Sequence, residues 1–326
     1  FKSVMAAQGA DQKSPDEVFL GDHREDREGR PVGEALRVVS FNIERGYKVD
    51  ACAAHLASLD ADIVLLQECD VGCKRTDSRN VAEDIAKVLK MQLVWACEYV
   101  EVDSARRPKH LAGGGSTGNA ILSRYPIKAH GSFHHAAQPN SWLNSLTQPR
   151  LGGRVVVWGD IVVPKLGDVR VYSAHLENFC GILSRVEQFS EIIAHAQGAG
   201  TTVIGGDLNT LMHGIVRFLP YFYPSDDGLR LRTLGVSEAG WWKRYVLGPD
   251  SPSPVPPRLS CLDGLDVKSF SDPFDTENDF TLRPGPCAQP SCATAASPTS
   301  RSPCNSADAH CSAYGFCVTA ASTTSR

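Results

Sequence analysis

Four apolar stretches of this chain, all containing β-branched residues, end in polar side chains. Their ends are Phe41-Asn42, Gln67-Glu68, Ala174-His175 and Gly206-Asp207-Leu208-Asn209. Stretches of this kind form buried strands, so each polar group is expected at the edge of a sheet. One such placement is ordinary. Four of them in order, carrying carboxylate, amide and imidazole groups, are hard to explain by packing and predict one shared site.

Size and charge narrow the class of protein. A chain of 326 residues can form one large domain or two small ones, and its 42% hydrophobic and 21% charged content is typical of globular proteins. A net charge of −4 argues against a protein that holds nucleic acid through bulk positive charge, although nucleic acid remains an open partner for an enzyme with a few local phosphate contacts. No apolar run reaches the roughly 18 residues of a membrane-spanning helix, so no transmembrane segment is predicted. We expect a monomer.

The cysteines indicate a reducing compartment. Six of the 11 are scattered along the chain and five lie in its last 40 residues, and an odd total fits a closed disulfide framework poorly. We therefore expect free thiols and an intracellular protein, cytoplasmic or nuclear. The chain begins at Phe1 rather than at a methionine, so we expect the N-terminus to be incomplete, which leaves targeting open.

Composition divides the chain into three parts. Residues 1–35 are polar and are expected to be a disordered lead-in, and residues 36–283 form one α/β domain with a proline-rich loop at 249–257. Residues 284–326 contain no Leu or Ile and one Val, so this Cys-, Ser- and Pro-rich tail is expected to be disordered. Strands are predicted at 36–43, 63–66, 92–100, 119–123, 154–163, 169–176 and 201–205, and helices at 51–59, 81–89 and 183–197. Asp50 and Asn80 are the predicted caps of the first two helices.

The polar ends carry the chemistry of a metal site beside a phosphate. Mg²⁺ prefers oxygen ligands, and Glu68 ends a buried run where an unpaired charge would be costly. Asn42 can ligate the ion or hydrogen-bond a phosphate, and His175 can donate to a non-bridging oxygen. Asp207 can orient a water, and Asn209, two residues on, would share its face if the strand continued. Taken singly, each also has an ordinary reading as a solvent-facing carboxylate, a local turn or a structural histidine.

Two further residues are weaker candidates. Asn119, within Gly118-Asn119-Ala120, can face the substrate phosphate. Arg75 can contact an anion, although a solvated loop charge is the preferred reading.

As a set, these motifs resemble the endonuclease/exonuclease/phosphatase superfamily, the DNase I-like fold. The residues that carry the resemblance are Phe41-Asn42-Ile43, Leu66-Gln67-Glu68, Gly118-Asn119-Ala120-Ile121-Leu122-Ser123, His175-Leu176 and Gly206-Asp207-Leu208-Asn209. The resemblance implies a four-layer α/β sandwich of two mostly antiparallel sheets flanked by helices. It also implies hydrolysis of a phosphodiester or phosphomonoester by activated water, with Mg²⁺ as cofactor and Mn²⁺ as an alternative. Glu68 would be the main metal ligand with Asn42 as its neighbour, His175 and Asn209 would contact the phosphate, and Asp207 would orient the nucleophile. Nucleic acid, phospholipid head groups and inositol phosphates all remain open as substrates.

The resemblance fails near the C-terminus. Members of the family end with a strand that carries Ser-Asp-His, and an earlier strand usually begins with Leu-Asp and an aromatic residue. Here Leu262-Asp263 is followed by Gly264 instead of an aromatic residue, and Ser306–His310 contains an extra alanine between the Asp and the His. The composition changes abruptly at Arg283-Pro284, which we attribute to a frameshift or mis-spliced exon that replaced the last strands. We therefore expect a fold that is incomplete at the C-terminus and an impaired enzyme. The alternative is a catalytically inactive binding module on the same fold, and a zinc or redox role for the tail ranks last.

Overall fold

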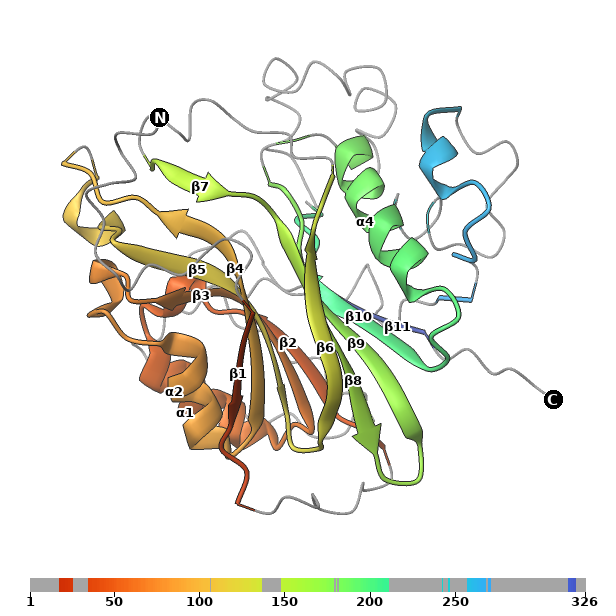
Figure 1. The fold of residues 1–326 in the computed structure, drawn as a ribbon, viewed down its shortest axis with the longest axis horizontal. Helices are drawn as coiled ribbons and strands as arrows, with labels where there is room; N and C mark the ends of the chain where they lie inside the picture. Colours follow the sequence, from red (N-terminus) through yellow and green to blue (C-terminus); the bar gives the residue numbers. More distant parts are fainter. Residues whose placement is uncertain are drawn as a thin grey trace, which may run out of the picture.

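Two β-sheets packed face to face form the centre of the protein, and helices cover the outer face of each (Figure 1). The computed structural model describes residues 18–25, 35–105, 107–136, 148–178, 180, 182–210, 242, 246, 257–267, 269–270 and 316–320. This is the predicted four-layer α/β sandwich with mostly antiparallel sheets. Within the described residues, no helix is long and apolar enough to cross a bilayer.

The first sheet has the strand order β1-β4-β5-β3-β2, with β7 also paired to β4. Its strands are β1 (Val18–Asp22), β2 (Val38–Asn42), β3 (Ile63–Val71), β4 (Gln92–Glu101), β5 (Gly115–Ser123) and β7 (Arg150–Gly152). Strands β2 and β3 are parallel, and the other pairs are antiparallel.

The second sheet has the order β11-β10-β9-β8-β6. Its strands are β6 (Ile127–His134), β8 (Val155–Val163), β9 (Gly167–His175), β10 (Thr202–Asp207) and β11 (Phe316–Ala320). Here β9 and β10 are the parallel pair, and the remaining pairs are antiparallel.

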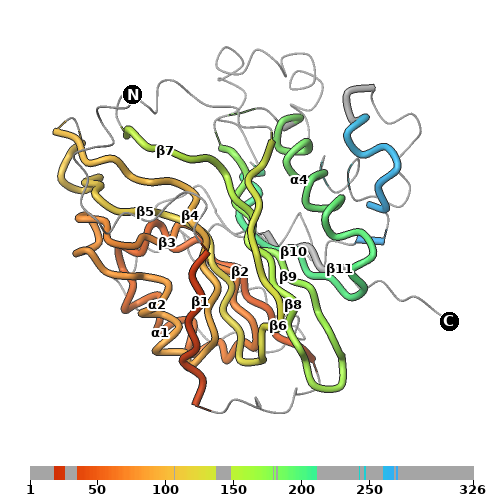
Figure 2. The backbone as a smooth tube through the Cα atoms, in the orientation of Figure 1, coloured from red at the N-terminus to blue at the C-terminus, as the bar shows by residue number. Residues whose placement is uncertain are grey.

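The helices lie on opposite sides of the sandwich, as the backbone trace in Figure 2 shows. Helices α1 (Val49–Leu59) and α2 (Val81–Leu89) cover the first sheet, and α4 (Ile182–Ala196) covers the second. Short 3₁₀ turns are η2 (Glu44–Gly46), η3 (Lys74–Thr76), η4 (Lys109–Leu111) and η8 (Pro257–Leu262).

Strand β3 shows why the sequence produces layers. Ile63 and Leu65 pack between the two sheets, whereas Val64 and Leu66 pack under α1 and α2. Successive side chains of a strand point to opposite faces, so a strand covered on both faces must be apolar throughout. The uninterrupted run from Ile63 to Leu66 therefore specifies a central strand.

The helix caps were predicted with mixed success. Asn80 caps α2 as predicted, since its side chain accepts a hydrogen bond from the Glu83 N–H at 3.2 Å. The prediction for Asp50 is wrong, because α1 begins at Val49, two residues before the predicted start, and Lys48 is its N-cap residue. Asp50 instead pairs with Arg79 at 2.9 Å.

Two strands lie in segments that we predicted to be disordered. Strand β1 pairs with the edge of β4, and Val18 and Phe19 pack against the cores on its two sides. Strand β11 pairs with the edge of β10. The prediction fails for these residues because an open sheet edge offers main-chain hydrogen bonds that local composition does not reveal. The rest of 284–326 and positions 249–256 of the proline-rich loop lie outside the described residues.

The two parallel pairs bring the predicted polar residues together. Parallel strands end at the same edge of a sheet, so Asn42 lies level with Gln67 in one sheet and Asp207 with His175 in the other. Between the sheets, Gln67 Nε2 donates to Ser173 Oγ and Ser173 Oγ donates to the Leu66 carbonyl, both at 3.0 Å. These bonds fix one pair of strand ends against the other.

We predict that Gly206→Ala disrupts this alignment. Gly206 has φ of 150°, and a Cβ there would lie 1.9 Å from the Ala174 carbonyl oxygen, so β10 would have to move away from β9. We expect a loss of about 1–3 kcal/mol or more in unfolding free energy, measured by urea denaturation. Gly198→Ala is the matched control, because Gly198 also has positive φ but no atom within 4 Å of the added Cβ. An equal loss in both variants would contradict the steric explanation.

Candidate active site

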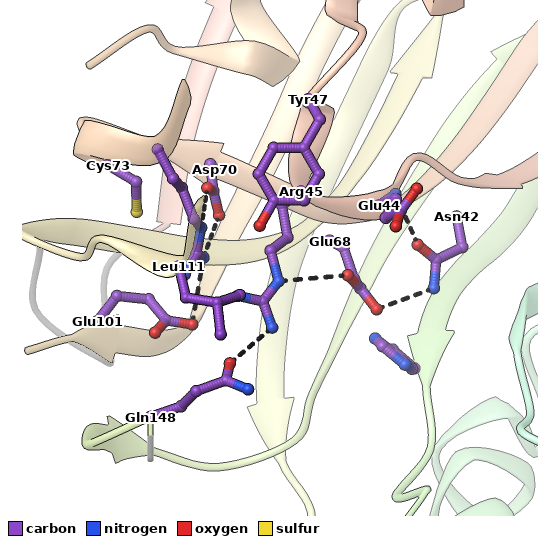
Figure 3. Close-up of polar contacts among 12 residues, drawn as sticks. Asn42, Glu44, Arg45, Tyr47, Glu68, Asp70, Cys73, Glu101, Leu111 and Gln148 are labelled. Atoms are coloured by element: carbon purple, nitrogen blue, oxygen red, sulfur yellow. Dashed lines mark hydrogen bonds and ion pairs between the residues drawn. The ribbon is translucent and has the colours of Figure 1, made fainter. Parts of the chain in front are cut away.

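The side chain of Asn42 joins the polar ends of the two sheets. Its Nδ2 donates to Glu68 Oε1 at 3.2 Å and to Asp207 Oδ2 at 3.0 Å, and its Oδ1 accepts from the Glu44 N–H at 3.0 Å. This pattern fixes the orientation of the amide, because the two carboxylates need a donor and the backbone N–H needs an acceptor. Figure 3 shows Asn42 between Glu44 and Glu68. Residues far apart in sequence are thus held within one hydrogen-bonded group.

Glu68 is the member of this group that reaches solvent. It lies at an irregularity in the pairing of β3 with β5, between Leu66 and Cys69, and has φ of 58°. A non-glycine residue in this left-handed region costs about 1–2 kcal/mol. The turn carries the carboxylate out of the strand, and the side chain is 28% exposed.

Asp207 and Asn209 lie at the end of β10. Asp207 is buried, and its Oδ1 accepts from the Asn209 N–H at 2.9 Å. Burial raises the pKa of Asp207, the donors Asn209 and Asn42 partly reverse this, and the charge of Glu68 raises it further. The strand ends at Asp207, so the prediction that both side chains share a strand face does not apply. Asn209 has φ of 51° and donates its Nδ2 to the Leu176 carbonyl at 2.8 Å.

His175 lies between two buried carboxylates. Its Nε2 is 3.8 Å from Asp207 Oδ2 and its Nδ1 is 3.8 Å from Glu98 Oε2, distances too long for hydrogen bonds. Among the described residues, Nδ1 has no hydrogen-bond partner. Burial, with the nearby charges of Arg154 and Arg150, lowers the pKa of His175 well below its usual value. The imidazole is therefore neutral near pH 7.

Sequence reasoning missed a buried charge network behind His175. Arg154 Nη1 donates to Glu98 Oε1 at 2.6 Å and its Nε to Glu177 Oε2 at 3.2 Å, and all three residues are buried. Burial raises the pKa of Glu98 to about 7, although Arg154 opposes the shift. The sequence signal for this network was the position of Glu98 within the apolar run of β4, because a buried carboxylate needs a positively charged or hydrogen-bonding partner.

Two weaker candidates lie elsewhere. Asn119 is fully buried. Its Nδ2 donates to the Val155 carbonyl at 2.8 Å, whereas its Oδ1 has no hydrogen-bond partner among the described residues, and the phosphate contact stays a prediction. Arg75 is neither a solvated loop charge nor an open anion contact. Its side chain is completely buried and donates to both oxygens of Asp70, at 2.6 and 2.7 Å.

The fold is that of a phosphoesterase scaffold. The sequence profile of the Endonuclease/Exonuclease/phosphatase family matches residues 39–263, more than half of the chain. The chain belongs to this family, whose members are typically hydrolases.

Solved structures of the same family are similar to this chain at low identity. An endonuclease/exonuclease/phosphatase from Beutenbergia cavernae DSM 12333 is 23% identical with a TM-score of 0.41, over 54% of this chain and 48% of that one. A family protein from Leptotrichia buccalis C-1013-b is 20% identical with a TM-score of 0.40, over 56% and 71%. D. rerio TDP2 complexed with single strand DNA product is 13% identical with a TM-score of 0.37, over 54% and 62%. The chain thus spans about half the length of the first of these, and a comparison with proteins of curated function finds no match.

The residues at the strand ends fit a divalent cation with oxygen ligands. Within the described part of the chain, no group of three or more His, Cys, Asp or Glu residues is arranged to hold a metal. However, the carboxylates of Glu68 and Asp207 both accept a hydrogen bond from the neutral amide of Asn42. This amide carries no positive charge to balance them, and the charge of Glu68 raises the pKa of Asp207. Carboxylate oxygens are ligands that Mg²⁺ accepts, and one or two carboxylates are usually enough.

The low pKa of His175 predicts a pH-dependent stability. Below about pH 6.5 the unfolded chain binds a proton at this residue and the folded protein does not, so His175 makes the protein less stable as the pH falls. In metal-free protein we expect this contribution to be up to about 1.4 kcal/mol per pH unit. It is the difference in slope between wild type and His175→Gln, because the raised pKa of Glu98, about 7, acts in the opposite direction in both proteins. Urea denaturation between pH 5 and 7 measures it.

His130 is a suitable control for this effect, because it is exposed on β6. The pH dependence should persist in His130→Gln. The same slope in wild type and His175→Gln would refute the assignment.

Proposed function

We propose that the chain hydrolyses a phosphoester by means of an activated water, with Mg²⁺ as cofactor and Mn²⁺ as an alternative. The observation that supports this most directly is the hydrogen bond from Asn42 to Asp207 at 3.0 Å, between residues 165 positions apart. It places the carboxylates of both sheets in one group at the edge of the sandwich, where a substrate can reach Glu68.

Glu68 and Asn42 are the residues that would hold the ion. Asn42 Oδ1 has a second lone pair beyond the one used by the Glu44 N–H, and Glu68 is open to solvent. When bound, such an ion polarises a phosphate oxygen and stabilises the negative charge that develops there.

Asp207 has the properties of a group that orients and deprotonates water. Its carboxylate is held by the Asn209 N–H and the Asn42 amide, so it has a defined direction. Its raised pKa brings it closer to the range in which a general base works near neutral pH.

His175 suits a phosphate contact because it is neutral. A neutral imidazole carries one N–H, and neither of its nitrogens lies within hydrogen-bond distance of Asp207 or Glu98. The ring can therefore donate to a non-bridging oxygen of the substrate and stabilise charge in the transition state. Asn209, next to the Asp207 carboxylate, is the second proposed phosphate contact.

The substrate class stays open between a phosphodiester and a phosphomonoester, carried by nucleic acid, a lipid head group or an inositol. One similar structure is a mannosyl-6-phosphatase from Bacteroides thetaiotaomicron, and another was solved with single strand DNA product. The net charge of −4 favours a substrate that needs few phosphate contacts. A panel of small phosphoesters is therefore the first measurement to make.

A catalytically inactive binding module is the second candidate function. It is favoured by the sequence, which contains no Ser-Asp-His motif. Among the described residues, His175 is the one histidine within 4 Å of the Asp207 carboxylate. The Ser306–His310 segment lies outside those residues.

We predict that Glu68→Gln lowers kcat/KM for a generic phosphodiester by roughly 10²–10⁴-fold. The substitution keeps the shape of the side chain but removes the charge that would hold the ion. Initial rates with bis(p-nitrophenyl) phosphate across a Mg²⁺ titration measure both the rate and the ion dependence.

Glu25→Gln is the matched control, because Glu25 is exposed and pairs only with Lys90 among the contacts of its side chain that the structure shows. Its rate should equal that of the wild type. If wild type shows no Mg²⁺-dependent turnover above the level of Glu68→Gln, the hydrolase proposal fails and the binding module takes its place.

A further inference from the structure

Arg45 lies beside Glu68 and is not used by the chemistry described so far. It belongs to η2, which directly follows Asn42 and Ile43, and its guanidinium points toward Glu68 and Gln148 (Figure 3). Its side chain is 19% exposed, so the group is mostly buried but can be reached from solvent.

The backbone holds Arg45 in an unusual conformation. Three successive residues have positive φ, namely Glu44 at 48°, Arg45 at 62° and Gly46 at 81°. A Cβ on Gly46 would lie 2.4 Å from Val81 Cγ1, so the turn is pressed against the start of α2. Strained backbone of this kind persists only where surrounding contacts impose it, and it is concentrated at functional sites.

The guanidinium has more donors than partners. Its Nη2 donates to Gln148 Oε1 at 2.8 Å, while Nη1 is buried with no hydrogen-bond partner among the described residues. Its Nε lies 3.9 Å from Glu68 Oε2, well beyond the roughly 2.7–2.9 Å of a charge-assisted hydrogen bond. A buried donor without an acceptor is costly, so an oxyanion at Nη1 would be stabilised there.

Other arginines of the protein show how a guanidinium engages a carboxylate in a structural ion pair. Arg75 donates to both oxygens of Asp70 at 2.6 and 2.7 Å, and Arg170 donates to both oxygens of Asp160 at 2.7 Å. Nη1 of Arg75 also lacks a hydrogen-bond partner among the described residues, but the side chain of Arg75 is completely buried. Arg45 makes no bidentate pair with Glu68 and is partly exposed, so an anion can approach its side chain.

We propose that Arg45 binds a non-bridging oxygen of the substrate phosphate and that Gln148 positions its guanidinium for this contact. Arginine presents a rigid fork of donors that matches phosphate oxygens, and it has no acceptor with which to ligate a metal. The residue therefore complements Glu68, with the carboxylate taking the cation and the guanidinium taking the anion. This assignment rests on the proposed function, because it names a substrate contact at the same site.

Binding of inorganic phosphate tests the contact without turnover. In full-length protein with EDTA, we expect Arg45→Gln to weaken phosphate binding by about tenfold or more in isothermal titration calorimetry. Arg45→Lys should recover only part of the affinity, because an ammonium lacks the fork. Arg37→Gln is the control, since Arg37 is 58% exposed and pairs with Asp60 at 3.2 Å.

Glu68 provides a second measurement that a purely structural role for Arg45 would not reproduce. Removing its charge eliminates repulsion of the anion and competition for Arg45, so Glu68→Gln should bind phosphate more tightly than wild type. The gain should be smaller in the Arg45→Gln background, because there only the repulsion is removed and no competition for Arg45 remains. A gain of equal size in both backgrounds would overturn the assignment.

The role of Gln148 is tested by the same cycle. Gln148→Ala should weaken phosphate binding in the wild-type background and have no further effect in Arg45→Gln. Equal effects in both backgrounds would show that Gln148 does not act through Arg45.

The two proposals fail in different ways. If wild type binds phosphate through Arg45 but hydrolyses no phosphoester, the proposed function fails and the assignment stands. If hydrolysis depends on Glu68 while neither phosphate affinity nor KM responds to Arg45→Gln, the assignment is wrong and the proposed function stands.

Discussion

One buried amide holds the candidate site together. Asn42 donates to a carboxylate of each sheet and accepts from the backbone of the turn that follows it. Because a buried amide must satisfy its hydrogen bonds, the spacing of the two sheets at this edge is tied to the direction of the Glu68 and Asp207 side chains. The Gln67–Ser173 bond reinforces the same alignment a short distance inside the sandwich.

The site concentrates both strain and unbalanced charge. Glu44, Arg45, Glu68 and Asn209 have left-handed backbone conformations although none is glycine. Behind them, Arg154 compensates Glu98 and Glu177, while Asp207 and Glu68 share a neutral donor. Such features reduce stability on their own. Four of the nine described non-glycine residues with positive φ therefore lie at this one edge.

The sequence revealed the central strands and the polar residues at their ends, because a buried strand is recognisable from its own run of apolar residues. The run Ile63–Leu66 and the residues Gln67-Glu68 that follow it are visible without any partner. Strands β1 and β11 were missed because their pairing depends on open edges of β4 and β10, which are distant in sequence. Asn119 shows a related limit. A polar residue in a strand can donate a hydrogen bond within the interior, here to the Val155 carbonyl, and the sequence does not distinguish this from a ligand contact.

Strand β11 indicates which sequences can pair with the edge strand β10. The pairing of Phe316–Ala320 with β10 runs antiparallel and in continuous register, opposite the residues that lead to Asp207. Main-chain hydrogen bonds of this type are the same for most amino acids, proline excepted. A segment of unusual composition can thus pair with the edge strand of a sheet whose core is formed by other parts of the sequence. The sheet edge beside the candidate site would then tolerate wide variation in the sequence of the strand that covers it, so long as five consecutive residues remain able to lie extended.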